Sequence, residues 1–220
     1  MKKIVLICLA AVLMLACASC GEKETVSSAE NKPASSQITE TSSVKNESDA
    51  TSSENLKEVV SQKAREALSQ VVTNNMTEVE KAKISYDWLF FHFKYRGMAV
   101  DVSGGYTDEL TQELAAYYFK YHKGSCEHYA AAQKVLLEEL GFNVRYVEGE
   151  RYDSQNNVWG EHVWVMMEIG GNWYHVDGLF GGNHTASLSS MFCVPDSALE
   201  NTHRWDKEKY PACTQPQLLK

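Results

Sequence analysis

The stretch Gly124-Ser125-Cys126-Glu127-His128-Tyr129-Ala130 decides how the rest of this 220-residue chain is interpreted. Gly124 interrupts one helical pattern, and Ser125 is a favourable N-cap for the next helix. Cys126 would then lie in the first helical turn, where unpaired backbone N–H groups and the positive end of the helix dipole stabilise a thiolate. The same N–H groups could hold the oxygen that becomes negative when an acyl carbon is attacked. We expect Gly124 to leave room for a substrate beside this thiol.

Two later residues, His162 and Asp177, could serve as a base for this thiol and as the group that orients the base. They lie on two strands that we expect to pair. Gly170-Gly171 is a hairpin signal between the predicted strands 162–169 and 173–177. With a two-residue turn, His162 and Asp177 become diagonal neighbours on one face of the sheet. A register slip of one residue would place them on opposite faces. The pattern therefore predicts Cys126 as nucleophile, His162 as its base and Asp177 as the group that orients the imidazole.

Two further side chains on these strands are candidates for the walls of a cleft. Trp164 could exclude water from the thiol and imidazole, although aromatic residues on strands more often serve packing. His175 alternates onto the face of Asp177, where it either lines the cleft or is a hydrogen-bonded strand histidine.

Helices are expected before the sheet. Apolar spacing and capping signals predict four of them, over Leu56–Val72, from Thr77 to Phe91, from Thr107 to Tyr118 and from Ser125 to Leu140, with Gly141 as the last stop. A strand over Val144–Val147 precedes the two described above. Helices followed by an antiparallel sheet indicate the α+β class.

The N-terminal part of the chain is typical of an export signal. Two lysines precede a short apolar run, Ile4–Ala16, which is followed by Cys17 and Cys20 among small residues. This end resembles the lipobox of bacterial lipoproteins, with Cys17 as the lipidated residue, Cys20 as the alternative, and a plain cleaved signal as the remaining reading. We therefore expect residues 1–20 to be a lipoprotein signal and the protein to be exported and held on the outer face of a bacterial membrane.

The next segment, residues 21–55, is rich in Ser, Thr, Glu, Asn and Lys and has almost no large apolar side chain. Such a composition cannot bury enough surface to offset ordering, so a flexible tether is expected. The remaining residues, 56–220, suit one compact domain. The formal net charge of -8 and the lack of a basic run argue against nucleic-acid binding.

The cysteines and histidines of the domain leave two questions open. In an exported protein Cys193 and Cys213 could form a disulfide, but spacing alone does not show that their side chains meet. His122, Cys126 and His128 invite a zinc interpretation, yet no paired zinc-ligand motif accompanies them, so we expect no metal and no cofactor.

Several segments together resemble the transglutaminase-like superfamily, whose members are related to papain-type thiol proteases. The segments that carry the resemblance are Lys123–Ala130, Leu136–Gly149, Glu161–Trp164 and Trp173–Asp177, with Tyr86–Leu89 and Lys94-Tyr95 upstream and Met191–Asp196 and His203–Asp206 downstream. The resemblance implies a papain-like fold and the same roles for Cys126, His162 and Asp177. Tyr95 is a candidate for a second oxyanion donor. Val165 and Gly178 stand where many members have Asn and Pro, which puts the substrate preference in doubt.

These observations predict a lipid-anchored thiol enzyme that forms a thioester from a peptide or protein amide at the cell surface. Water as acceptor gives a cysteine peptidase or amidase, which we favour because water is always present. An amine as acceptor gives a cross-linking transglutaminase. The alternative from another class is a binding module that holds a peptide or cell-wall component without turnover.

Overall fold

The computed structural model describes residues 44–179 and 191–219, and all of them belong to a compact unit that spans Thr41–Lys220. The predicted signal, its two candidate lipidation sites Cys17 and Cys20, and the tether up to residue 43 lie outside the described residues. In the described part of the chain, no helix is long and apolar enough to cross a bilayer.

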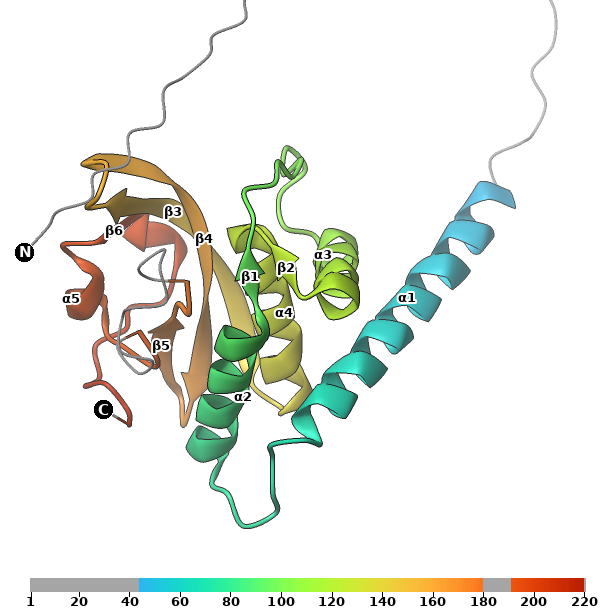
Figure 1. Cartoon of the computed structure of the whole chain (residues 1–220), viewed down its shortest axis with the longest axis horizontal. Helices are drawn as coiled ribbons and strands as arrows, with labels where there is room; N and C mark the ends of the chain where they lie inside the picture. Colours follow the sequence, from blue (N-terminus) through green and yellow to red (C-terminus); the bar gives the residue numbers. More distant parts are fainter. Residues whose placement is uncertain (1–43, 180–190, 220) are drawn as a thin grey trace, which may run out of the picture. The chain divides into compact units, whose positions relative to one another are not determined.

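Four helices open the domain (Figure 1), namely α1 (Val44–Leu68), α2 (Glu78–His92), α3 (Asp108–Tyr121) and α4 (Cys126–Glu139). The predicted caps of the last three are confirmed at Thr77, Thr107 and Ser125, with a complete capping box at Thr77. Gly141 follows α4 with a φ of 91°, as its predicted role as the stop requires.

The first helix differs from its prediction in both bounds. It begins at Val44, inside the segment predicted as a tether, and it ends at Leu68, before the predicted end at Val72. The segment before residue 56 has few apolar side chains, so hydrophobic periodicity could not place a helix start there.

An antiparallel sheet follows the helices. Its strands are β3 (Asn143–Asp153), β4 (Val158–Ile169), β5 (Asn172–Val176) and β6 (His203–Trp205), in the spatial order β5-β4-β3-β6. Ile169 pairs with Asn172, so the β4–β5 connection is the predicted two-residue turn, and Gly170 and Gly171 both have positive φ. The α+β class and the register of the hairpin are thus confirmed.

Some short elements were not predicted. They are the parallel pair β1 (Lys94–Tyr95) and β2 (Lys123–Gly124), the strand β6, the helix α5 (Asp196–Leu199) and a 3₁₀ turn over Lys207–Lys209. Elements of two to four residues carry no periodicity of their own, because their pairing is decided by the tertiary fold.

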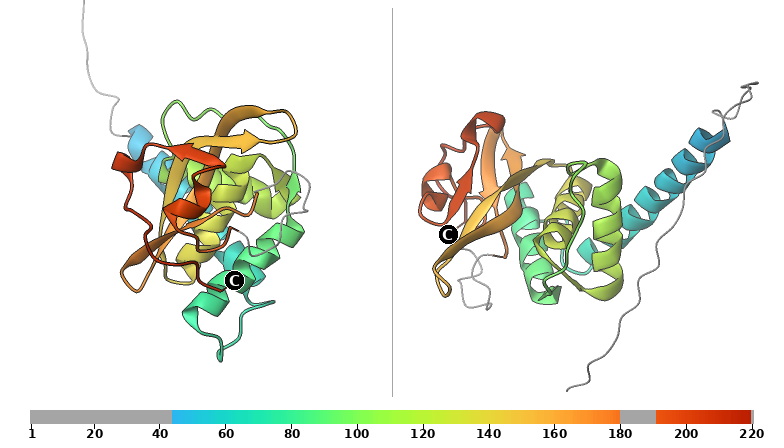
Figure 2. Two further views of the ribbon diagram at one scale, coloured as in Figure 1. Left: turned by 90° about the vertical axis from the view of Figure 1, so that its left-hand side faces the viewer. Right: turned by 90° about the horizontal axis from the view of Figure 1, so that it is seen from above.

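Both faces of the sheet are covered (Figure 2). On one face α4 packs against β3 and β4, and Ala130 and Leu137 lie in a core cluster with Val163 and Val165. On the other face the C-terminal segment contributes Leu199 and Cys213 to a cluster with Trp164 and Met166. The middle of β4, residues 162–167, is therefore buried on both faces, and alternate side chains of this stretch point into the two cores.

Candidate active site

Cys126 is the first residue of α4, as predicted. Upstream, β1 and β2 run parallel with Tyr95 opposite Gly124, and the Arg96 N–H donates to the Gly124 carbonyl over 2.7 Å. This pairing brings Tyr95 to the thiol, so both residues line the same cavity.

Gly124 is required for a reason other than the expected substrate access. A Cβ at this position would lie 2.4 Å from the Cβ of His128. The His128 ring is buried against the turn, and its Nδ1 accepts a hydrogen bond from the Ser125 N–H over 3.3 Å. Gly124 therefore lets the histidine close the first turn of α4 beneath the thiol.

The predicted pairing of base and carboxylate is present in the structure. The Nε2 of His162 lies 2.9 Å from Oδ2 of Asp177, and both side chains are buried. His162 lies on β4, and Asp177 directly follows β5. Because Nε2 faces the carboxylate, Nδ1 of His162 is the ring nitrogen left to accept a proton from a nucleophile.

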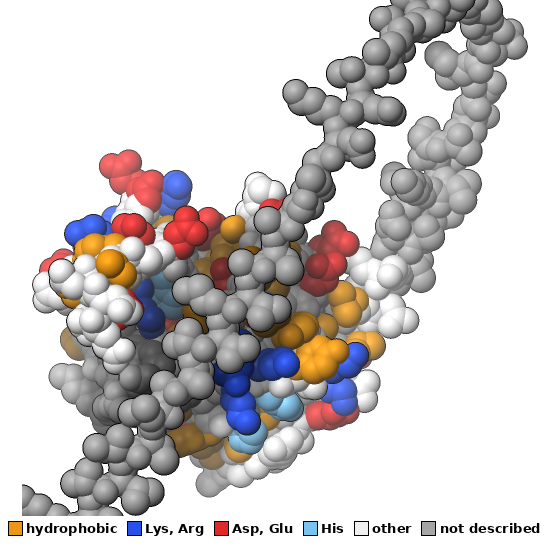
Figure 3. Space-filling view, turned by 45° about the horizontal axis from the view of Figure 1, so that its top comes forward, with side chains coloured by type: hydrophobic (Ala, Val, Ile, Leu, Met, Phe, Trp, Pro, Cys, Tyr) orange, Lys and Arg blue, Asp and Glu red, His pale blue; other side chains and the backbone are white. Residues whose placement is uncertain are grey.

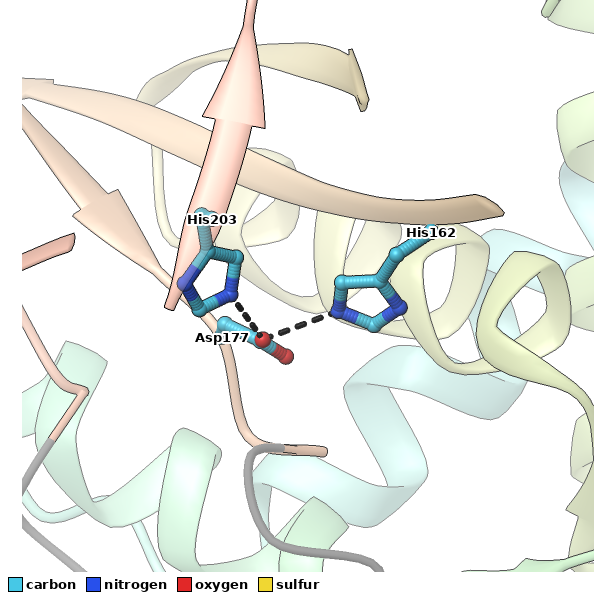
Figure 4. Close-up of side chains that lie close together, drawn as sticks. All are labelled: His162, Asp177 and His203. Atoms are coloured by element: carbon cyan, nitrogen blue, oxygen red, sulfur yellow. Dashed lines mark hydrogen bonds and ion pairs between the residues drawn. The ribbon is translucent and has the colours of Figure 1, made fainter. Parts of the chain in front are cut away.

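A second histidine, His203, contacts the same carboxylate oxygen (Figure 4). Its Nε2 lies 3.0 Å from Oδ2 of Asp177, while the other oxygen, Oδ1, accepts the Leu179 N–H over 2.9 Å. Burial alone would raise the pKa of Asp177, but His162 and His203 outweigh it and hold this pKa well below the usual value. Asp177 is therefore an ionised carboxylate between two imidazole donors.

The surroundings of the thiol differ from the expectation of a lowered pKa. Burial and the adjacent Glu127 carboxylate raise the pKa of Cys126 to about 12, although a backbone hydrogen bond from Val163 lowers it. The sulfur lies 3.4 Å from Oε2 of Glu127 and donates to it. Cys126 is consequently a neutral thiol at rest, so it needs a base to become a nucleophile.

One cavity joins these groups. Its volume is about 340 Å³, and it is lined by Phe90, Tyr95, Cys126, Arg151, Asp153, Val158, Gly160, Glu161, His162, Gly178 and Leu179. The predicted nucleophile and its predicted base thus line one cavity, and the carboxylate of Asp177 lies behind the base.

Two candidate cleft residues, Trp164 and His175, lie elsewhere. Trp164 is 1% exposed and stacks behind the His162 ring, with centroids 5.8 Å apart. Its Nε1 donates to Nδ1 of His175 over 3.0 Å, and Nε2 of His175 lies 2.9 Å from Oδ1 of Asp196. Both residues therefore belong to the buried layer beneath the C-terminal segment, and neither lines the cavity.

The packing of α4 explains why glycine stands at position 178. A Cβ at this position would lie 1.8 Å from Oη of Tyr129, which is buried on α4. The position after Asp177 therefore has no room for a side chain.

The remaining cysteines of the domain are free. Cys193 and Cys213 are both buried thiols, so the suggested disulfide between them is not formed. Burial raises the pKa of each, which makes them poor nucleophiles at neutral pH.

Two groups in the described residues have the donor types that could hold a metal ion, with ligand atoms within 4.8 Å of one another. They are His162, Asp177 and His203, and His175, Asp196 and Cys213. In both groups the histidine nitrogens already form hydrogen bonds with the carboxylate oxygens, and these bonds account for the arrangement. His122, Cys126 and His128, which the sequence suggested as ligands, do not form such a group.

Replacing Glu127 with glutamine is expected to increase the reactivity of Cys126. Removal of the carboxylate charge lowers the thiol pKa, and each unit corresponds to about a tenfold larger thiolate fraction. We expect several-fold to about tenfold faster alkylation by iodoacetamide at pH 8. The rate is measured by mass spectrometry on the tryptic peptide 124–134, in which Cys126 is the sole cysteine.

The matched control for this change is Glu161→Gln, because Glu161 lines the same cavity and is not among the groups that raise the thiol pKa. Equal rates for Glu127→Gln and the unmodified protein would contradict the assigned electrostatic role.

Comparison with known proteins identifies the family. The model of the transglutaminase-like superfamily matches residues 65–178, more than half of the chain. The chain belongs to this superfamily, and its mixed helices and curled antiparallel sheet are a transglutaminase-like fold. The match contains Cys126, His162 and Asp177 and ends before His203.

Solved structures show weaker similarity. A proposed cysteine protease from Cytophaga hutchinsonii is 18% identical, with a TM-score of 0.38 over 58% of this chain and 38% of its own. Arylamine N-acetyltransferase C from Bacillus anthracis is 18% identical, with a TM-score of 0.39 over 54% of this chain and 48% of its own. A TGase is 20% identical, with a TM-score of 0.39 over 66% of this chain and 38% of its own. The chain thus spans less than half the length of these proteins, and no curated protein matches it significantly.

Proposed function

We propose that the domain is a thiol-dependent amide hydrolase that acts on a peptide or protein. The observation that carries this proposal is the shared cavity of Cys126 and His162, with His162 held by Asp177 over 2.9 Å. Thiol enzymes of the superfamily include hydrolases and acyltransferases, so the choice of water as acceptor is part of the proposal.

The reaction begins with a neutral thiol. His162 accepts the Cys126 proton at Nδ1 while the sulfur attacks the carbonyl carbon, and Asp177 stabilises the imidazolium that forms. The carbonyl oxygen takes up the negative charge beside the N-terminus of α4, because the first N–H groups of a helix have no intrahelical partner and can donate to it.

The tetrahedral intermediate then collapses. The C–N bond breaks, the amine leaves with the proton held by His162, and a thioester remains on Cys126. Water attacks the thioester as His162 takes its proton, which releases the carboxylic acid and restores the thiol. An amine in place of water would complete a transamidation by the same steps.

Tyr95 supports the oxyanion in this proposal. It is half-exposed and lines the cavity with Cys126, and its partial burial raises its pKa. The hydroxyl therefore stays protonated at neutral pH and can donate a hydrogen bond.

We further propose that the domain works outside the cytoplasm, anchored by a lipid on Cys17 or Cys20. Support comes from the N-terminal sequence alone, in which two lysines, a short apolar run and a cysteine among small residues follow one another. On the face of the domain shown in Figure 3, acidic, basic and hydrophobic side chains lie side by side. The formal net charge of -8 and the lack of a basic run in the sequence favour a lipid over a basic surface as the attachment.

The test is the rate of Cys126 alkylation by iodoacetamide between pH 6 and pH 10, in the unmodified protein and in His162→Ala. A general base within reach predicts that the unmodified protein reacts at least about tenfold faster at pH 7. The ratio of the two rates should fall steadily from pH 7 to pH 10, as the pH moves towards the thiol pKa of about 12. The urea-unfolded chain provides the reference for a thiol without a base.

Equal, slow alkylation in both proteins would refute the proposal of a thiol enzyme. The alternative function, a binding module without turnover, would then remain. If the thiol is reactive, a peptide mixture with and without added cadaverine distinguishes the acceptors. Hydrolysis yields shortened or deamidated peptides, and transfer yields cadaverine adducts.

A further inference from the structure

His203 is placed at the site by a strand that the family match does not include. It lies on β6 opposite Arg151 of β3, and it is 2% exposed. Its Nε2 lies 3.0 Å from Oδ2 of Asp177, and its Nδ1 lies 2.9 Å from the Thr202 hydroxyl. The ring is therefore held from both sides with one nitrogen directed at the carboxylate.

The neutral ring of His203 can donate a hydrogen bond from Nε2 to the carboxylate of Asp177. Burial lowers the pKa of His203, so the ring is neutral at pH 7. With its single proton on Nε2, the ring donates to Asp177, and Nδ1 accepts from Thr202. One carboxylate oxygen then receives two N–H donors, from His162 and from His203.

We propose that His203 is a positioning residue that acts through Asp177 and completes a four-residue arrangement with Cys126 and His162. The proposal rests on the proposed function of the same site. His203 and the Leu179 N–H hold the two carboxylate oxygens, so the plane of the carboxylate is fixed. Asp177 in turn fixes the His162 ring with Nδ1 available to the thiol.

Loss of the His203 donor would leave a buried carboxylate oxygen with one hydrogen bond fewer. The carboxylate could then turn about its side-chain bond, and the imidazole would lose its fixed orientation. The effect should therefore appear in the rate of acylation and only weakly in the binding of the acyl donor.

The test compares His203→Gln with His203→Met. The two side chains have similar shape, but only glutamine carries an N–H that can reach Asp177. The probe is p-nitrophenyl acetate, and the readout is the rate and saturation of the nitrophenolate burst on Cys126. We expect His203→Met to acylate about tenfold to a hundredfold more slowly at nearly unchanged KM, and His203→Gln to keep most of the rate.

A double-mutant cycle with Asp177→Asn tests whether His203 affects the acylation rate through Asp177. If His203 acts through Asp177, His203→Met should cause little further loss in the Asp177→Asn background. His203→Phe is a second variant without a hydrogen-bond donor. Its ring fills the volume of the imidazole, so it serves as the test if the His203→Met protein does not fold.

His175 offers a matched control. It is fully buried, and its Nε2 contacts a carboxylate, Asp196, over 2.9 Å, yet it does not line the cavity. The same substitutions at His175 should lower the unfolding temperature and leave the burst rate unchanged.

Three results would overturn the proposal. They are a burst in the donorless variants as fast as in the unmodified protein, equal losses in His203→Gln and His203→Met, and additive losses in the double-mutant cycle. In each case a His162-dependent burst in the unmodified protein would leave the proposed function standing. A Cys126 alkylation rate that does not depend on His162, together with no release of nitrophenolate by the unmodified protein, would refute both.

Discussion

Asp177→Asn is expected to slow acylation of Cys126 by about a thousandfold or more, with little change in fold. The amide removes the charge that stabilises the imidazolium of His162. It also lets an N–H₂ group face Nε2, which shifts the imidazole proton to Nδ1, the nitrogen that must accept the thiol proton. The measurement is the rate of the p-nitrophenolate burst at pH 7, with thermal unfolding as the check on the fold.

Asp196→Asn is the matched control for this prediction. Asp196 holds His175 over the same 2.9 Å by which Asp177 holds His162, but neither residue of that pair lines the cavity. We expect a change in unfolding temperature without a large change in the burst. An Asp177→Asn protein that acylates within tenfold of the unmodified protein would remove Asp177 from the mechanism.

Cys126→Ala is expected to abolish the burst and the acetylated form of the protein. The other thiols of the domain, Cys193 and Cys213, are buried at 0% and 1% exposure and cannot substitute for it. Intact-mass spectrometry after exposure to p-nitrophenyl acetate should show one acetyl group on the unmodified domain and none on the variant. Cys213→Ala is the control, and it should keep the acetyl group on peptide 124–134.

The same variant separates an enzyme from a binding module. The cavity loses one sulfur atom and keeps its walls, so affinity for a captured peptide should survive the substitution. A Cys126→Ala protein that still releases nitrophenolate in a burst would place the nucleophile elsewhere.

The sequence predicted the parts of the site that local patterns determine. A glycine pair fixed the β4–β5 register, and that register made His162 and Asp177 neighbours, as their 2.9 Å contact confirms. Ser125 likewise located the start of α4 and hence the position of Cys126. The catalytic roles of these residues stay predictions until the burst is measured.

Residues placed by the tertiary fold were missed or misassigned. His203 lies on a three-residue strand that pairs with β3, about fifty residues earlier, and no periodicity marks so short an element. Alternation placed His175 on the correct face of the sheet but could not show that the C-terminal segment covers that face. The thiol pKa also depended on burial and on the orientation of Glu127, which are tertiary properties.

The C-terminal segment also affects where the domain can be divided. The family match ends at residue 178, yet β6 brings His203 to Asp177, and Val194 forms a β-bridge with His175 along the outer edge of β5. A fragment cut at the family boundary would retain Cys126, His162 and Asp177 but lose one face of its core. For this protein we expect the smallest unit able to hold the site to reach at least to Cys213, which belongs with Trp164 to that second core.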